Sequence, residues 1–167
     1  MITQIKKILY ATDLSKNSSY AFLHATDMAK RHNATMIILH AIEPIPPYAE
    51  VYRGMTDETD RKQQEETVEE IKKHLQIFCK KAEAQIGPPC VDLVSKILVR
   101  VGHPPEEILK AADEEGCDVI VLGTHGKGFL AHTFLGSVSS SVLHRTRKPV
   151  FVIPLPSEKT TIDWDGI

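Results

Sequence analysis

The sequence of 167 residues lacks an excess of one charge and long apolar runs. Its 20 Lys and Arg residues nearly balance 22 Asp and Glu residues, which gives a formal net charge of -2. Without an overall positive field the chain is not held on a polyanion, so we expect no nucleic-acid partner. No apolar run reaches the roughly 18 residues that span a membrane, and the stretch after Lys6 and Lys7 is too short for a signal sequence. We therefore expect a cytoplasmic protein with no membrane partner.

Cysteine is also scarce. The chain has 3 cysteines, Cys79, Cys90 and Cys117, and no C-x-x-C pair. Widely spaced cysteines in an odd number do not indicate a zinc site or a redox pair. We expect reduced and mostly packed thiols.

What the chain does contain is the composition of one globular domain, with 42% hydrophobic and 25% charged residues. Residues 155–167 carry no apolar period and are expected to form a tail after a domain at 1–154. Residues 43–57, with three prolines, form a long connection that is either a lid or partner surface or a plain connector.

Short apolar runs alternate with helical periodicities along the domain. The runs predict strands over residues 5–11, 35–41, 118–122 and 150–153, and the mixed, alternating pattern of residues 93–101 predicts an edge or partly exposed strand. The periodic segments predict helices over residues 17–33, about 59–86, 104–116 and from 137 onward. In the long second helix the stripe formed by Val68, Ile71, Leu75, Phe78 and Ala82 fits the core, although its spacing also permits a partner helix. The alternation predicts an α/β fold, an open parallel sheet with helices on both faces.

Ligands of open parallel sheets bind beyond the carboxyl ends of the strands, so the strand exits are the candidate sites. The exit after the fourth strand, residues 123–128, holds three glycines, a pattern that weakens a fold unless the backbone must turn or approach something closely. Lys127 and His125 add positive charge or donors to this loop. A plain turn is the alternative reading of the glycines alone.

Gly136 and Ser137 open the last helix, whose first turn offers unpaired amides and a positive dipole end. The hydroxyls of Ser137 and Ser139 add donors, so loop and helix together suit a nucleotide polyphosphate. Asp13, at the exit of the first strand, is placed to accept from a ribose hydroxyl or an adenine amine. Asp13 also suits a helix or turn cap, and Ser137 suits an N-cap.

These residues resemble a known family. The spacing Gly123, two residues, Gly126, nine residues, Gly136-Ser137 is similar to the nucleotide motif of the ATP-binding universal stress proteins. Further likeness lies in the opening at residues 11–15, the turn at 101–104, the segment at 117–122 and Lys148-Pro149-Val150. The resemblance covers roughly residues 3–154; Ala11 stands where the family often has proline, and the tail is longer than the family core.

The resemblance implies a five-stranded sheet of order 3-2-1-4-5, with the exits of strands one and four side by side. It implies that Thr12, Asp13 and the backbone near Ala41 hold adenine and ribose. It further implies that the phosphates are held by Gly123, Thr124, His125, Gly126, Lys127, Gly136, Ser137, Val138 and Ser139. The expected cofactor is ATP, ADP or AMP with Mg or Mn. Metal ligands within the chain are not identified, because the spacing of His125, His132 and His144 matches no familiar ligand set.

At a sheet edge, the last strand would expose the apolar residues Val150, Phe151, Val152 and Ile153 together with unpaired backbone groups. Antiparallel pairing with a second copy would cover them, so we expect a homodimer. Together with these residues, the resemblance implies a nucleotide-responsive regulator in stress response, with a downstream protein partner not identified. A slow ATPase or nucleotidyl transferase is one alternative, although no nucleophile elbow and no paired carboxylates appear near the expected phosphates. An interaction protein without nucleotide is the other.

Overall fold

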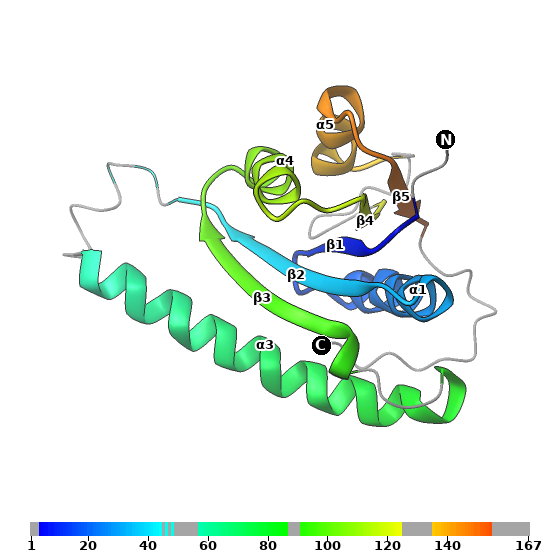
Figure 1. Cartoon of the computed structure of the whole chain (residues 1–167). Helices are drawn as coiled ribbons and strands as arrows, with labels where there is room; N and C mark the ends of the chain where they lie inside the picture. The colour runs from blue at the N-terminus through cyan, green and yellow to red at the C-terminus, as the bar shows by residue number, and fades with distance from the viewer. Residues whose placement is uncertain are drawn as a thin grey trace.

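The computed structural model describes residues 4–44, 46, 48, 57–86, 91–124 and 135–154. These residues form a 5-stranded parallel sheet of order β3-β2-β1-β4-β5 (Figure 1). The strands are β1 (Lys7–Thr12), β2 (Thr35–Ile42), β3 (Val94–Val101), β4 (Val119–Gly123) and β5 (Val150–Ile153). The helices are α1 (Lys16–His32), α3 (Asp57–Ile86), α4 (Pro104–Glu114) and α5 (Ser137–Arg145), with a short 3-10 helix η1 (Val91–Leu93) before β3. The expected α/β class and strand order are confirmed.

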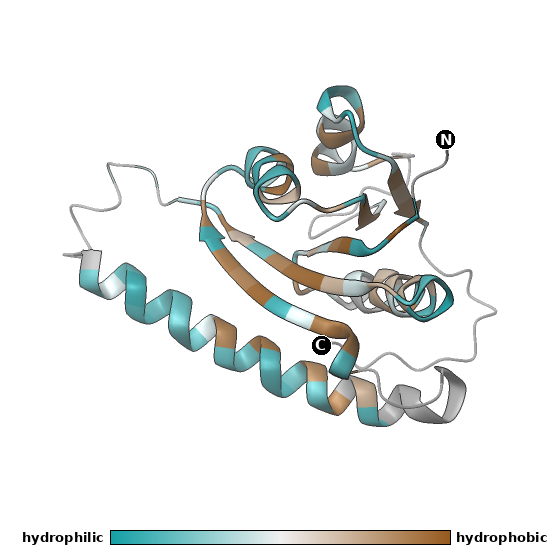
Figure 2. Cartoon of the chain, viewed as in Figure 1, coloured by the Kyte–Doolittle hydropathy of each residue, from teal (hydrophilic) through white to brown (hydrophobic). Residues whose placement is uncertain are grey.

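The sheet separates two apolar layers. On one face, side chains such as Phe22 of α1 and Leu75 of α3 pack on Tyr10 and Ile38. On the other, Ile108 of α4 and Val142 of α5 pack on Leu9, Leu39 and Ile120. Figure 2 shows the strands as largely hydrophobic and the first turns of α3 as largely hydrophilic. Because the inner strands are covered on both faces, their sequences are nearly continuous apolar runs.

Helix ends follow the local chemistry read from the sequence. Asn33 ends α1 in the left-handed conformation (φ 52°), and its amide donates back to the helix carbonyls of Ala29 and Lys30. Gly116 supplies the corresponding positive φ of 63° after α4, a conformation that costs glycine little. The third strand begins at Val94, because residues 91–93 are wound into η1.

The stripe on α3 is a core stripe where its side chains are described. Ile71 and Leu75 are buried against the sheet, and Val68 is half-buried. The side chains of Phe78 and Ala82 lie outside the described residues. The first turns of α3, residues 58–70, contain no buried side chain among the described residues.

The outer strand β5 exposes less apolar surface than the sequence indicated. Phe151 is 47% exposed, and Val150 and Val152 are half-buried, but Ile153 is buried at 9% because it turns into the layer beneath α1. In the described segments no helix combines the length and the hydrophobicity that crossing a membrane requires.

The cysteine prediction is wrong for Cys79, which is disulfide-bonded. Sequence spacing cannot exclude such a bond, because the fold, not the spacing, decides which thiols meet. Cys117 is free and buried, as expected, and burial raises the pKa of its thiol to about 11. Cys90 lies outside the described residues.

We therefore expect the two described cysteines to differ in reactivity. At pH 8 the Cys117 thiolate amounts to about one part in a thousand, so native protein resists iodoacetamide, and its labelling accelerates as the pH rises toward 11. In urea without reductant, peptide mass spectrometry finds Cys117 alkylated and Cys79 unmodified. Alkylation of Cys79 under those conditions contradicts the disulfide.

Candidate functional site

The carboxyl ends of the three central strands meet at one edge of the sheet. In the β1 and β2 pair, Thr12 lies opposite His40, and Ala41 is the next residue of β2. In the β1 and β4 pair, Tyr10 lies opposite Val121, so two residues further along both strands end, at Thr12 and at Gly123. The predicted nucleoside residues and the first predicted phosphate residue thus leave the sheet side by side.

Asp13 lies in a tight turn between β1 and α1. The Ser15 amide donates to Asp13 Oδ1 at 3.0 Å, and the Leu14 amide donates to Thr12 Oγ1 at 3.0 Å. Leu14 adopts a positive φ of 62°, an uncommon conformation for a residue with a side chain, which the two side-chain acceptors stabilise. The Asp13 carboxylate is therefore held by the turn, and Asp13 as a residue is half-buried at the strand ends.

The turn is fastened to the first turn of α1. The Thr12 hydroxyl donates to Ser18 Oγ at 2.9 Å, and Ser18 Oγ donates to the Ser15 carbonyl at 2.7 Å. The Tyr10 hydroxyl donates to the Ser18 carbonyl, and burial raises the pKa of Tyr10, so it remains a neutral donor. The Thr12 hydroxyl therefore donates to Ser18 and accepts from the Leu14 amide, so both of its hydrogen-bonding roles serve the turn.

A further contact reaches the same turn from β2. His40 Nδ1 lies 2.8 Å from the carbonyl oxygen of Thr12, across 28 residues of sequence. Sequence reasoning passed over His40. The available signal was a histidine, His40, near the end of an otherwise apolar run at residues 35–42.

The two glycine-containing segments also come together. The Gly136 amide donates to the Thr124 carbonyl at 2.6 Å, and Ser139 Oγ donates to the Gly123 carbonyl at 2.7 Å. The Thr124 amide in turn donates to the Ile153 carbonyl at 2.9 Å, which ties the exit of β4 to β5. Thr124 and Ser139 are buried, at 8% and 5% exposure. Helix α5 is thus fixed with its first turn beside the end of β4.

The first turn of α5 is uncapped. Gly136 is the N-cap residue and provides no side chain, and no acidic residue lies in the first turn. Within the described residues no hydrogen bond is made to the amides of Ser137, Val138 and Ser139. The Val138 side chain packs against the core, so only the backbone amide of Val138 could contact a ligand at the strand ends. Unpaired amides and the helix dipole make such a turn favourable for an anion.

The predicted site residues therefore fall in three groups. The strand ends bring together Thr12, Asp13, Ala41 and Gly123, and the bond to Thr124 adds Gly136, Ser137, Val138 and Ser139. His125, Gly126 and Lys127 lie outside the described residues. Among the described residues no group of three His, Cys, Asp or Glu side chains is arranged to hold a metal ion.

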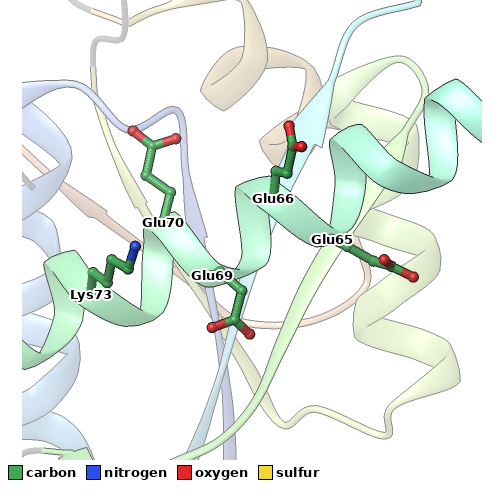
Figure 3. Close-up of a pocket in the computed structure, with 5 residues that line it drawn as sticks. All are labelled: Glu65, Glu66, Glu69, Glu70 and Lys73. Carbon is green, nitrogen blue, oxygen red and sulfur yellow. The ribbon is translucent and has the colours of Figure 1, made fainter.

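A pocket of about 400 Å³ lies along α3, lined by Glu65, Glu66, Glu69, Glu70 and Lys73 (Figure 3). Figure 3 shows Glu66 and Glu70 pointing to one side of the helix, with Glu65 and Glu69 directed elsewhere. Lys72 donates to Glu69 at 2.7 Å, and this bond lowers the pKa of the Glu69 carboxyl. A lining dominated by carboxylates disfavours a phosphate ligand.

Comparison with known proteins identifies the family of this chain. The model of the universal stress protein family matches residues 4–154. The chain belongs to the universal stress protein family. The universal stress protein MJ0577 of Methanocaldococcus jannaschii is 32% identical over 157 residues, covering 92% of this chain and 97% of that protein. A universal stress protein of Thermus aquaticus is 34% identical over 148 residues, covering 89% of this chain and 98% of its own length.

Solved universal stress proteins share the fold. The structure of MJ0577 superposes with a TM-score of 0.69 at 30% identity, covering 93% of this chain and 99% of that one. A universal stress protein in complex with cAMP gives a TM-score of 0.57 at 24% identity, covering 90% and 98%. The Archaeoglobus fulgidus protein in complex with dAMP gives 0.54 at 22% identity, covering 92% and 100%. The resemblance stated from the sequence is confirmed at the level of family and fold.

Proposed function

We propose that this chain binds ATP at the ends of β1 and β4 and acts as a nucleotide-responsive dimer in stress response. The observation that carries the proposal is the 2.6 Å bond from the Gly136 amide to the Thr124 carbonyl. It fixes the uncapped first turn of α5 beside the exit of β4, while the β1 register brings Asp13 to the same edge. One edge thus offers amides for phosphates and a carboxylate for a nucleoside.

Asp13 is the proposed nucleoside contact. A carboxylate accepts hydrogen bonds from ribose hydroxyls, and the bond from the Ser15 amide already orients Asp13. The backbone near Ala41, one residue past the partner of Thr12, completes the nucleoside end. The family supports an adenine nucleotide, because two solved members were crystallised with cAMP and dAMP, which share that base.

The expected Mg or Mn fits as an ion carried by the nucleotide. Mg²⁺ commonly binds phosphate oxygens and water with one or two protein carboxylates at most. That habit agrees with the described residues, which provide no three-ligand cluster. When bound, the ion would neutralise phosphate charge next to the amides of α5, and the chain's own contribution is to hold the phosphates in place.

Asp13→Asn tests the nucleoside end. Asparagine keeps an oxygen for the Ser15 amide, so the turn survives, but the charge is lost. We expect ATP affinity to fall about tenfold or more in calorimetry, because hydrogen bonds to charged acceptors are the strong ones. Asp27→Asn, which removes an exposed carboxylate paired with Arg31 in the same helix, leaves affinity unchanged. Equal ATP affinity in Asp13→Asn and unmutated protein would show that Asp13 is not the nucleoside contact. Phosphate release from the same samples measures any ATP turnover.

Ser137→Pro tests the phosphate end. Proline is favoured at the first helical position, and Gly136 before it already has the extended backbone (φ -67°, ψ 162°) that a residue before proline needs. The variant therefore deletes one amide donor and keeps the helix. We expect the affinity for ATP and for tripolyphosphate to fall about fivefold, with unchanged adenosine affinity.

Ser137→Ala is the matched control, since it loses the hydroxyl and keeps the amide. If alanine weakens tripolyphosphate binding as much as proline does, the hydroxyl and not the helix amide holds the phosphate. Melting temperatures without ligand report whether either variant has disturbed the fold.

The proposed dimer forms through the exposed edge of β5. Phe151 is 47% exposed on that edge strand, and an edge strand presents backbone groups that a second copy can pair. We expect light scattering to give twice the mass of one chain, and Phe151→Glu to give a single chain. Val101→Glu places the same charge on the opposite edge strand, β3, at a residue 41% exposed, and keeps the dimer. If the dimer survives Phe151→Glu and dissociates with Val101→Glu, the interface lies on β3 and the proposed β5 interface is wrong.

A further inference from the structure

His40 is the polar residue that sequence reasoning passed over, and it lies on the same sheet face as the turn it contacts. Its neighbours two and four residues back, Ile38 and Met36, belong to the layer packed under α1 and α3. Side chains alternate along a strand, so the His40 ring lies on that face too. Tyr10 of β1 belongs to the same layer. The half-buried ring therefore stands next to the Thr12–Ser15 turn.

The direction of the hydrogen bond follows from its partner. A carbonyl oxygen only accepts, so His40 Nδ1, 2.8 Å from the Thr12 carbonyl, carries the proton. The distance is that of a good hydrogen bond. The bond fixes the peptide unit that joins Thr12 to Asp13, because a planar peptide held at its oxygen also has its amide direction set.

Asp13 is thus held from both sides. The preceding carbonyl is bound by His40, and the carboxylate is bound by the following Ser15 amide. A carboxylate already oriented loses less conformational freedom when a ligand binds.

We propose that His40 is a positioning residue for the nucleoside end of the site, holding the Thr12 carbonyl so that Asp13 points at the ligand before it arrives. The proposal rests on the nucleotide binding proposed above. It also limits the effect of His40 to one end of the ligand, because the phosphate end is built from β4 and α5, which His40 does not contact through any described hydrogen bond.

Two substitutions separate the hydrogen bond from the ring. His40→Asn keeps a donor nitrogen on the Cγ carbon, where Nδ1 stands, and His40→Leu fills the space without a donor. By calorimetry we expect His40→Leu to weaken adenosine and ATP about fivefold and His40→Asn to restore both to within about twofold of the unmutated protein. Affinity for tripolyphosphate stays unchanged in both variants. His144→Leu is the matched control, because it removes a ring nitrogen 2.7 Å from the Ser140 carbonyl on the exposed end of α5, and it leaves all three affinities unchanged.

The possible results distinguish a failure of the His40 role from a failure of nucleotide binding itself. If His40→Leu binds adenosine as well as the unmutated protein, or if His40→Asn binds it as weakly as His40→Leu, the positioning role is overturned. If tripolyphosphate weakens in parallel with adenosine, His40 acts on the whole fold and not on one end. If unmutated protein binds neither adenosine nor ATP, the proposed function itself fails, and the inference about His40 falls with it. Melting temperatures of the ligand-free variants identify a variant that has lost its fold, and His40→Asn then carries the comparison.

Discussion

The central position of β1 is the constraint on which the other features depend. The chain builds outward from β1 through β2 to β3, then returns to the other side of β1 to add β4 and β5. Connections between parallel strands are right-handed, so reversing the direction of growth moves the helices to the opposite face. This places α1 and α3 on one face and α4 and α5 on the other (Figure 1). The connections after β1 and β4 consequently diverge, and the open edge between them is where a ligand can enter without displacing a helix.

At the other end of the sheet, where β1 and β4 begin, described polar side chains bind the backbone of neighbouring segments. Asp118 Oδ2 accepts from the amides of Lys6 at 2.8 Å and Lys7 at 2.9 Å, which fixes the start of β1 against β4. Lys148 Nζ donates to the Cys117 carbonyl at 2.8 Å, and Lys7 Nζ donates to the Glu115 carbonyl at 2.8 Å. Several positions that carried the family resemblance, Asp118 and Lys148 among them, therefore hold strands in register and do not face the candidate site. The family resemblance therefore rests partly on residues of the candidate site and partly on residues that hold the strands together.

The sequence predicted most of what depends on local chemistry and less of what depends on register. Apolar runs predicted four strands of the described residues, and an alternating pattern predicted the fifth, β3. Asn33 indicated a helix end and Gly136-Ser137 a helix start, because each is decided within a few residues. The contact between His40 and Thr12 joins residues 28 apart and exists only because β1 and β2 pair in one particular register. The disulfide of Cys79 was missed for the same reason, since spacing rules say nothing about which residues meet. The strand order came from family resemblance, because alternation alone leaves the order of parallel strands open.

The N-terminus of α5, the proposed phosphate end of the site, has no side-chain cap. Serine, aspartate or asparagine as N-cap stabilises a helix because the side chain accepts from an amide of the first turn. Alanine in its place costs about 1 kcal/mol, and glycine costs only about a few tenths of a kcal/mol. Here the N-cap is Gly136, and the serine stands one residue later, inside the helix, with no side-chain capping bond at the N-cap. This small deficit is offset by the hydrogen bonds from Gly136 to Thr124 and from Ser139 to Gly123, which hold the helix end without using the amides of residues 137–139. A side-chain cap would occupy the same donors that an anion requires, so Gly136 as N-cap leaves open the amides that the proposed phosphate contact would use.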